Sequence, residues 1–248
     1  MASGTFVSKD ALRRIISDIK QIRKNPLSAH GIYYEHDDVD ILKGRALIIG
    51  PADTPYADGF YLFKFQFPAN YPHAPPKVEF CTSDGQTRFN PNLYRAGKVC
   101  LSILNTWKGE PWSGCQTISS VLLSMCTILN DEPLLNEPGI MKSHRDFEPY
   151  NEIIRYKNIE VAIFGMLDSV SANALGSESV SAEATSSTNP IDASEFAVFG
   201  DCMRKYFQEN KEKIRQRVER LKETDQTYSI NVYKMTVKTD YAGLLARF

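Results

Sequence analysis

The chain has 248 residues, of which 42% are hydrophobic, and this is enough for one large core or for a domain of roughly 150 residues with an extension. Its formal net charge is -1, so nothing draws the chain as a whole to nucleic acid or to an anionic membrane, and we expect neither as a partner. The five cysteines are odd in number and contain no Cys-x-x-Cys pair, which speaks against a disulfide framework and against a zinc site.

The start of the sequence carries no targeting signal that we recognise. It has no apolar signal core and no myristoylation glycine, and no apolar run approaches the roughly 18 residues of a membrane span. Because unpaired cysteines suit a reducing compartment, we expect a soluble protein of the cytoplasm, with the nucleus as a second location. Residues 1–7 are expected to form an N-terminal tail.

Residues 8–24 predict an amphipathic first helix, with Ser8 as its N-cap and Asn25-Pro26 as its stop. Its apolar stripe consists of residues three or four apart, with one adjacent pair: Leu12, Ile15, Ile16, Ile19 and Ile22. The other face is basic and carries Lys9, Arg13, Arg14, Lys20 and Arg23. A charged helix face of this kind is by default solvated surface.

The period of the sequence changes between residues 31 and 80, where β-branched and aromatic runs are separated by Gly-Pro and Asp-Gly turns. The runs at 45–49 and 61–67 are the clearest. This segment predicts three or four antiparallel strands in a meander. Farther along, apolar residues at helical spacing predict a central helix over 115–129 with its stripe in the core.

The helical period resumes over residues 150–167, and the composition then changes. The following segment is rich in small and polar residues and has no aromatic residue, so it cannot offset its ordering entropy, and we expect a flexible linker at 169–191. A long amphipathic helix is predicted over 192–224 and a short one over 241–248. The predicted organisation is a tail at 1–7, a core domain at 8–168, the linker at 169–191, and a helical C-terminal extension at 192–248.

The segment 88–104 holds the strongest candidate for chemistry, the cysteine at Cys100. A proline follows Asn90 and favours an extended or turn conformation there, and Gly97 marks a second turn. Cys100 therefore follows a loop. Taken alone, a thiol between two apolar neighbours is more typical of a small buried hydrophobe, because cysteine is among the most buried residue types.

A resemblance changes that balance. Asn90-Pro91-Asn92, followed by Gly97 and by Cys-Leu-Ser-Ile-Leu from Cys100, is similar to the active-site signature of ubiquitin-conjugating enzymes. Three flanking motifs agree with the same family, namely Gly-Pro at 50–51, Tyr-Pro-x-x-Pro-Pro at 71–76 and Trp-Ser at 112–113. Such ordered matches over about 65 residues are specific. The resemblance implies the α+β ubiquitin-conjugating (UBC) fold, with an N-terminal helix, a four-stranded antiparallel meander and a central helix.

The chemistry that the resemblance implies is a thioester relay. Cys100 accepts ubiquitin, or a ubiquitin-like modifier, from an activating enzyme and passes it to a lysine of a protein substrate with a ubiquitin ligase as partner. Asn92 either stabilises the oxyanion of the tetrahedral intermediate or only pins the loop. Glu132 stands where many members carry an acid, and it either orients the attacking lysine or is simply exposed. No cofactor is implied, because ATP is consumed by the activating enzyme.

The resemblance also assigns residues around the loop. Arg13, Arg14 and Lys20 of the basic face correspond to the surface that docks the activating enzyme. Asn90, before Pro91, stands where the family has a histidine whose role is mainly to hold the loop, so activity is expected to survive the difference.

An insertion separates Cys100 from Trp112, and it contains Trp107, a large apolar side chain for a loop. The insertion is either a plain surface turn or an element that gates or contacts the incoming acceptor. A similar insertion and a C-terminal extension occur in the Z-type subgroup of the family, which this chain resembles in both respects.

Two other function classes stay open on the sequence. The first is a non-catalytic binding module of the same fold, although such variants lack the cysteine. The second is a cysteine hydrolase, which needs a histidine base near the thiol. The histidines lie in no hydrolase-type motif, and they are His30, His36, His73 and His144.

Overall fold

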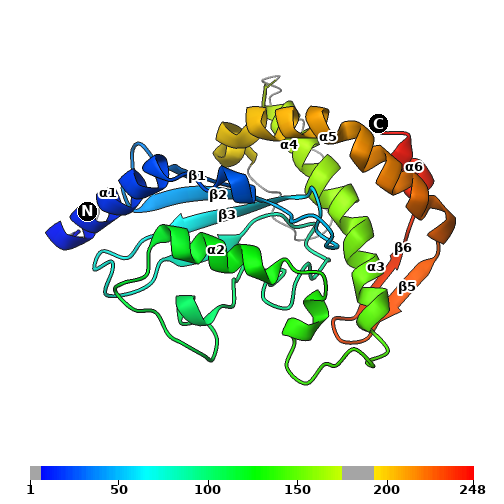
Figure 1. Cartoon of the computed structure of the whole chain (residues 1–248), viewed down its shortest axis with the longest axis horizontal. Helices are drawn as coiled ribbons and strands as arrows, with labels where there is room; N and C mark the ends of the chain where they lie inside the picture. Colours follow the sequence, from blue (N-terminus) through cyan, green and yellow to red (C-terminus); the bar gives the residue numbers. More distant parts are fainter. Residues whose placement is uncertain (1–6, 175–192) are drawn as a thin grey trace, which may run out of the picture.

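The computed structural model describes residues 7–174 and 193–248, which form an α+β fold around a four-stranded sheet (Figure 1). In chain order the helices and strands are α1 (Lys9–Lys24), β1 (Ile32–His36), β2 (Lys43–Ile49), β3 (Phe60–Gln66), β4 (Lys77–Phe80), α2 (Ile118–Ile128), α3 (Phe147–Lys157), α4 (Met166–Ala174), α5 (Gly200–Leu221), β5 (Thr227–Ile230), β6 (Met235–Lys238) and α6 (Tyr241–Leu245). None of the described helices is long and apolar enough to cross a membrane. All but the last residue of the predicted tail lies outside the described residues.

Helix α1 begins where the sequence predicts. The Ser8 side chain accepts a hydrogen bond of 3.0 Å from the Ala11 amide and so caps the first turn. Ile15 is fully buried and Ile22 nearly so, whereas Ile16, which the pattern also places on the stripe, is 43% exposed. The predicted first helix is therefore confirmed, with a narrower apolar face.

Strands β1 to β4 form an antiparallel meander in the order β1-β2-β3-β4, which confirms the predicted sheet. Alternate side chains of a strand point to opposite faces. In β3, Tyr61 and Phe63 enter the main core together with α2, while Phe60 and Leu62 enter a second apolar cluster with α4 and α5. The sheet is therefore a middle layer, with α2 on one face and the C-terminal helices on the other (Figure 1).

Helix α2 starts at a capping box. The Thr117 hydroxyl accepts from the Ser120 amide at 3.2 Å, and the Ser120 hydroxyl accepts from the Thr117 amide at 2.9 Å. Four of its residues, Ile118, Val121, Leu122 and Met125, are fully buried. The predicted central helix is confirmed, but it begins three residues later than the apolar pattern suggested because Thr117 caps it.

Helices α3 and α4 are joined by a π-helical stretch, Asn158–Gly165, so the chain is helical from 147 to 174. The buried Asn158 side chain fixes this stretch to the sheet, because its Nδ2 donates to the Ala57 carbonyl at 2.9 Å and its Oδ1 accepts from the Tyr61 hydroxyl at 2.6 Å. An inserted π turn reorients the side chains that follow it. Here the stretch turns Phe164 toward the second apolar cluster.

The predicted linker is wrong at its start. Residues 169–174 belong to α4. The buried Val170 side chain packs in the second apolar cluster, and this packing stabilises the helix beyond residue 168. The remainder of the predicted linker, 175–191, lies outside the described residues.

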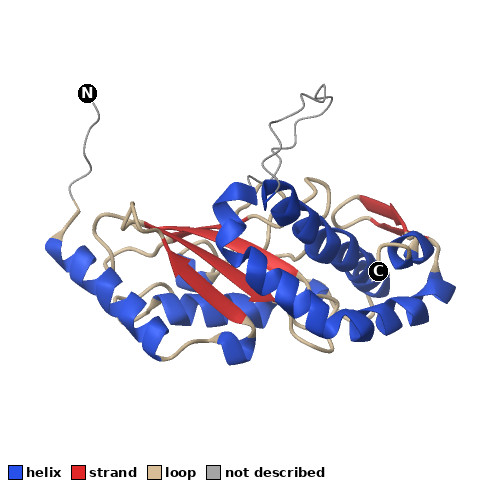
Figure 2. Cartoon of the chain, turned by 90° about the horizontal axis from the view of Figure 1, so that it is seen from above, coloured by secondary structure: helices blue, strands red, loops and turns tan. Residues whose placement is uncertain are grey.

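The C-terminal extension packs on the sheet, and it is not only helical. Helix α5 lies within the predicted helix of 192–224, after a 3-10 segment at Ala193–Phe199, and α6 lies within the predicted short helix. Between them β5 and β6 form an antiparallel hairpin that the sequence pattern did not predict. Each strand has four residues, and the turn that joins them contains neither Gly nor Pro, so the usual hairpin signals are missing. Figure 2 shows the C-terminal helices lying over one end of the sheet.

A buried carboxylate anchors α5. Asp58, whose side chain is 3% exposed, accepts from the Tyr206 hydroxyl at 2.7 Å and from Arg217 Nη1 at 2.5 Å. Arg217 Nη2 also donates to the Ala57 carbonyl at 3.0 Å, and Lys213 Nζ lies 3.6 Å from the same carboxylate. The extension is thus fixed to the turn before β3 by charge as well as by apolar contact.

Replacing Arg217 by Met is expected to lower the free energy of unfolding by about 3 kcal/mol, because it leaves a buried carboxylate without its main partner. Urea unfolding followed by circular dichroism measures this. The matched control is Arg215→Met on the same helix, where the side chain is 50% exposed and a change within about 0.5 kcal/mol is expected. Equal stabilities of the two variants would show that Asp58 does not anchor the extension.

Candidate active site

Cys100 and Asn92 close the active-site loop by a reciprocal pair of hydrogen bonds. The Cys100 amide donates to the Asn92 carbonyl at 2.8 Å, and the Asn92 side-chain Nδ2 donates back to the Cys100 carbonyl at 2.7 Å. Within the described residues, the Asn92 Oδ1 atom is buried without a partner, and only one of the two Nδ2 hydrogens is used. The side-chain amide of Asn92 therefore pins the loop, and its second N–H group has no acceptor among the described residues.

The Cys100 thiol is oriented by Thr106. Cys100 is 2% exposed, and its Sγ donates to the Thr106 carbonyl at 2.9 Å. The Thr106 hydroxyl is itself fixed, since it donates to the Val99 carbonyl and accepts from the Leu101 amide, both at 2.9 Å. Thr106 was not predicted from the sequence, because a threonine six residues after a cysteine has no signature of its own.

The Asn90 side chain braces the same loop from inside. It is fully buried, and its Nδ2 donates to the Tyr56 hydroxyl and to the Ile128 carbonyl, both at 2.8 Å. Its Oδ1 accepts from the Asn92 amide at 2.9 Å. Both N–H groups and the oxygen are used, so this asparagine holds the loop, and the neighbouring Pro91 is buried with it.

Arg88 holds the loop from outside. Its Nε donates to the Asn90 carbonyl at 3.1 Å and its Nη2 to the Pro91 carbonyl at 2.7 Å. The guanidinium also lies over the Tyr94 ring, 3.4 Å from its centre. Arg88 was missed in the sequence, where a single arginine before the motif is indistinguishable from surface charge.

The charge around Cys100 is mixed. Burial raises the pKa of its thiol above the ordinary value, Lys98 and Arg88 act to lower it, and Glu137 acts to raise it. The thiol is therefore mainly protonated at neutral pH. The reactive thiolate is a minor form whose amount depends on these three side chains.

A groove of about 510 Å³ lies beside the loop, and its lining includes Val99 and Thr106, which flank the thiol. One wall comes from residues 75–79 and another from residues 96–99. The lining combines apolar side chains with the charged side chains of Lys77, Glu79 and Lys98.

Comparison with known proteins agrees with this geometry. Residues 14–158 match the family model described as "Ubiquitin-conjugating enzyme", and this match covers more than half of the chain. The chain belongs to the ubiquitin-conjugating enzyme family. The predicted UBC fold is thereby confirmed, with its N-terminal helix, four-stranded antiparallel sheet and central helix.

Several ubiquitin-conjugating enzymes are similar over the same region. "Ubiquitin-conjugating enzyme E2 Z" of Homo sapiens is 46% identical over 168 residues, which is 66% of this chain and 47% of that protein. The Danio rerio protein of the same name is 46% identical over 164 residues, 65% of this chain and 49% of that protein. "Dual E2 ubiquitin-conjugating enzyme/E3 ubiquitin-protein ligase BIRC6" of Homo sapiens is 49% identical over 128 residues, 48% of this chain and 3% of that protein.

The match thus spans about half the length of the E2 Z relatives. The predicted closeness to the Z-type subgroup of the ubiquitin-conjugating family is confirmed by their identity to this chain over two-thirds of its length.

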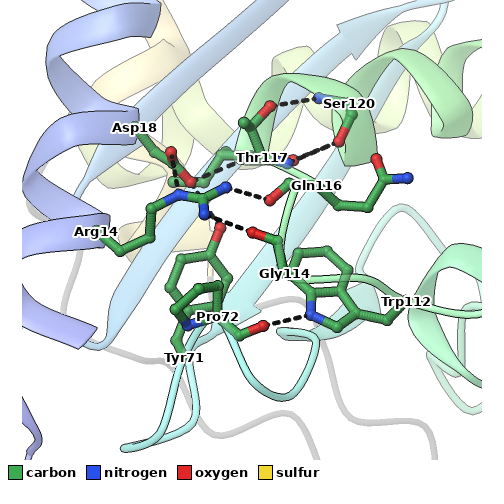
Figure 3. A network of polar contacts seen from close by, with 10 residues as sticks. Arg14, Asp18, Tyr71, Pro72, Trp112, Gly114, Gln116, Thr117 and Ser120 are labelled. Atoms are coloured by element: carbon green, nitrogen blue, oxygen red, sulfur yellow. Dashed lines mark hydrogen bonds and ion pairs between the residues drawn. The ribbon is translucent and has the colours of Figure 1, made fainter. Parts of the chain in front are cut away.

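Within this ubiquitin-conjugating domain, Arg14 joins α1 to the loop before α2 (Figure 3). Its Nε pairs with Asp18 Oδ1 at 2.9 Å, and its terminal nitrogens donate to the carbonyls of Gly114, at 2.6 Å, and Gln116. The buried Asp18 also accepts from the Tyr71 hydroxyl at 2.6 Å. Arg14 therefore has a structural role in holding two elements together.

The predicted docking surface for an activating enzyme is affected by this arrangement. The Arg14 side chain is 23% exposed and its guanidinium is bound internally, so it is a poor candidate for contact with a partner. Arg13 and Lys20 lie on the exposed face of α1 and stay predictions for that contact.

The two tryptophans of this region, Trp107 and Trp112, differ in how far they are buried. Trp112 is nearly buried, and its Nε1 donates to the Pro72 carbonyl at 2.7 Å (Figure 3), while its amide donates to Asn105 Oδ1 at 2.8 Å. Trp107 is 46% exposed. Trp112 thus fixes the end of the inserted loop, and Trp107 presents an apolar surface to solvent, where contact with an acceptor stays a prediction.

Glu132 is not brought to the cysteine by any hydrogen bond or ion pair among the described residues. Its carboxylate pairs with Lys142 Nζ, and its amide donates to Asn130 Oδ1 at 3.0 Å. The acid whose charge acts on Cys100 is Glu137, at the end of the next short helix. A role of Glu132 in orienting a lysine stays a prediction.

A cysteine hydrolase, the alternative function, requires a histidine base beside the Cys100 thiol. In the part of the chain that the structure describes, no histidine hydrogen-bonds to the Cys100 Sγ atom, whose partner is the Thr106 carbonyl. His36 binds the Tyr34 hydroxyl and the Ile41 carbonyl instead. Nor do residues 7–174 and 193–248 bring three His, Cys, Asp or Glu side chains together as metal ligands.

Proposed function

We propose that this chain accepts ubiquitin, or a ubiquitin-like modifier, from an activating enzyme as a thioester on Cys100 and transfers it to a lysine of a protein substrate. The observation that carries the proposal is the reciprocal pair of hydrogen bonds between Cys100 and Asn92, which places a thiol and an unused amide donor on one braced loop. Family membership supports it.

In the charging step, the Cys100 thiolate attacks the carbonyl carbon of the thioester that joins the activating enzyme to the modifier. A new C–S bond forms, the old one breaks, and the cysteine of the activating enzyme leaves as a thiolate. Lys98 and Arg88 favour the attacking thiolate by charge. ATP is consumed earlier, by the activating enzyme, so this site needs no cofactor of its own.

In the transfer step, a neutral lysine amine attacks the same carbonyl carbon. Negative charge develops on the carbonyl oxygen, and we propose that the N–H group of Asn92 that does not bind the Cys100 carbonyl donates to this oxygen. The intermediate then forms the amide bond and releases the Cys100 thiolate, while the proton lost by the amine passes to water and Cys100 regains one from water.

The partners follow from this reaction. Arg13 and Lys20 supply positive charge for an activating enzyme, and Glu132 supplies a carboxylate to the acceptor lysine. The exposed Trp107 is the candidate contact for the acceptor or for a ubiquitin ligase. The proposed location is the cytoplasm, with the nucleus as a second one.

A charging assay with ubiquitin, ATP and a ubiquitin-activating enzyme tests the proposal. We expect wild type to gain one ubiquitin that reductant removes, because a thioester is cleaved by thiols. Cys100→Ser is expected to give an oxyester that resists reductant, and Cys100→Ala to give no product. Cys115→Ser, at an exposed cysteine, is the control and should charge like wild type. Unchanged charging of Cys100→Ala would disprove the role of Cys100.

A further inference from the structure

The turn of the β5–β6 hairpin lies against the active-site loop, although the residues in contact are 138 and 147 apart in sequence. Arg95 Nη2 donates to the Tyr233 carbonyl at 2.7 Å, and the Arg88 amide donates to Met235 Sδ at 3.2 Å. The centre of the Tyr233 ring lies 5.3 Å from the Arg88 guanidinium, within the range of a cation–π contact. The hairpin therefore touches the arginine that holds the Asn90 and Pro91 carbonyls.

The same tyrosine also reaches a second charge near the cysteine. Its hydroxyl donates to Glu137 Oε2 at 2.5 Å. Lys98, Arg88 and Glu137 are the charged groups that act on the Cys100 thiol, and Tyr233 contacts two of them. One side chain of the extension thus links a cation and an anion of the active site.

The hairpin is itself fixed in place, which a positioning element requires. The buried Asp146 carboxylate, through Oδ2, accepts from the Asn231 amide at 2.8 Å and the Val232 amide at 2.9 Å. Ile230 and Met235, which flank the turn, are buried in the main core. The turn therefore has little freedom, and the position of the Tyr233 ring is set by the body of the fold.

We propose that Tyr233 is a positioning residue for the reaction of Cys100, and that its ring holds the Arg88 guanidinium against the Asn90 and Pro91 carbonyls. A free arginine side chain has several rotatable bonds, and ordering it costs conformational entropy. Contact with the Tyr94 and Tyr233 rings offsets that cost before substrate arrives. For the transfer step the inference rests on the proposed function, but its effect on the Cys100 thiol does not.

The test compares Tyr233→Phe with Tyr233→Leu. Both substitutions remove the hydroxyl that binds Glu137, and only leucine also removes the ring, so their difference isolates the ring contact with Arg88. Tyr228→Leu is the control for lost packing, because Tyr228 lies in β5 of the same hairpin and its hydroxyl faces Thr224, not the active-site loop. Circular dichroism establishes that each variant is folded.

Two measurements are made on each variant. The first is the single-turnover transfer of ubiquitin from preformed thioester to free lysine. We expect the leucine variant to be about fivefold slower than the phenylalanine variant, as for one lost cation–π contact. The second is the pH profile of Cys100 alkylation by iodoacetamide, followed by mass spectrometry of the Cys100 peptide. An Arg88 guanidinium that is held less firmly stabilises the Cys100 thiolate less, so the alkylation profile of Tyr233→Leu is expected to move to higher pH.

Identical transfer rates and identical alkylation profiles for the phenylalanine and leucine variants would overturn the proposal, and so would equal effects of Tyr228→Leu and Tyr233→Leu. If Tyr233→Leu does not fold, Arg88→Gln removes the same contact from the other side, and wild-type behaviour of that variant is the contradicting result. If wild type itself cannot be charged, the proposed function fails, whereas the alkylation profiles still decide the role of Tyr233.

Discussion

Replacing Asn92 by Ala is expected to slow transfer of the modifier from Cys100 to lysine by about 100-fold, the usual effect of losing one oxyanion donor. The reason lies in the two hydrogens of its amide. One donates to the Cys100 carbonyl, and the other has no acceptor among the described residues and is available to the developing oxyanion. A single-turnover discharge assay with preformed thioester and free lysine measures the effect.

Charging of the same variant separates the two roles of Asn92. Thioester exchange takes place against the activating enzyme, which contributes its own groups, so we expect charging of Asn92→Ala to fall by less than about fivefold. If charging and transfer instead fall by the same factor, Asn92 only pins the loop. In that case the stabilising donor must come from elsewhere.

Replacing Asn90 by Ala is expected to lower the free energy of unfolding by about 4 kcal/mol, because three hydrogen bonds of a fully buried side chain are lost. Their partners are the Asn92 amide, the Ile128 carbonyl and the Tyr56 hydroxyl. Denaturant unfolding measures the loss, and a charging assay should show a weakened active site as well.

Asn130→Ala is the matched control for Asn90→Ala. Asn130 is only partly buried, and its main contact is the hydrogen bond that its Oδ1 accepts from the Glu132 amide at 3.0 Å. We expect a loss of about 1 kcal/mol there. A loss at Asn90 no greater than that at Asn130 would mean that the Asn90 side chain does not brace the loop.

The elements that could be predicted from the sequence are those whose residue pattern lies within one short segment. The cap at Ser8 and the apolar stripe of α1 lie within one segment, and β2 and β3 of the meander are each a continuous run rich in β-branched or aromatic residues. The motif around Cys100 is equally local, since Asn92 and Cys100 are eight residues apart. In each case a short stretch contains both the pattern and its physical cause.

The residues that were missed or misplaced depend on contacts between distant segments. Arg88 is recognisable as a clamp only once the hairpin carrying Tyr233 is folded against it. Arg14 was grouped with the basic face of α1, but it points toward the loop before α2. A signal for this existed, because Asp18 lies one turn after Arg14 on the buried side of the helix, where an acid requires a partner.

The position of the sheet between two helical layers has a consequence for how the protein is made. Ile230 and Met235 complete the main core, and Phe207, Ile214 and Val218 cover the apolar face formed by Leu62 and its neighbours. During synthesis the whole meander, which ends at Phe80, has been made more than 120 residues before these later residues are added. The nascent sheet therefore keeps an uncovered apolar face until these residues have been made, and the domain reaches its stable form only after the β5–β6 hairpin has packed beside the active-site loop.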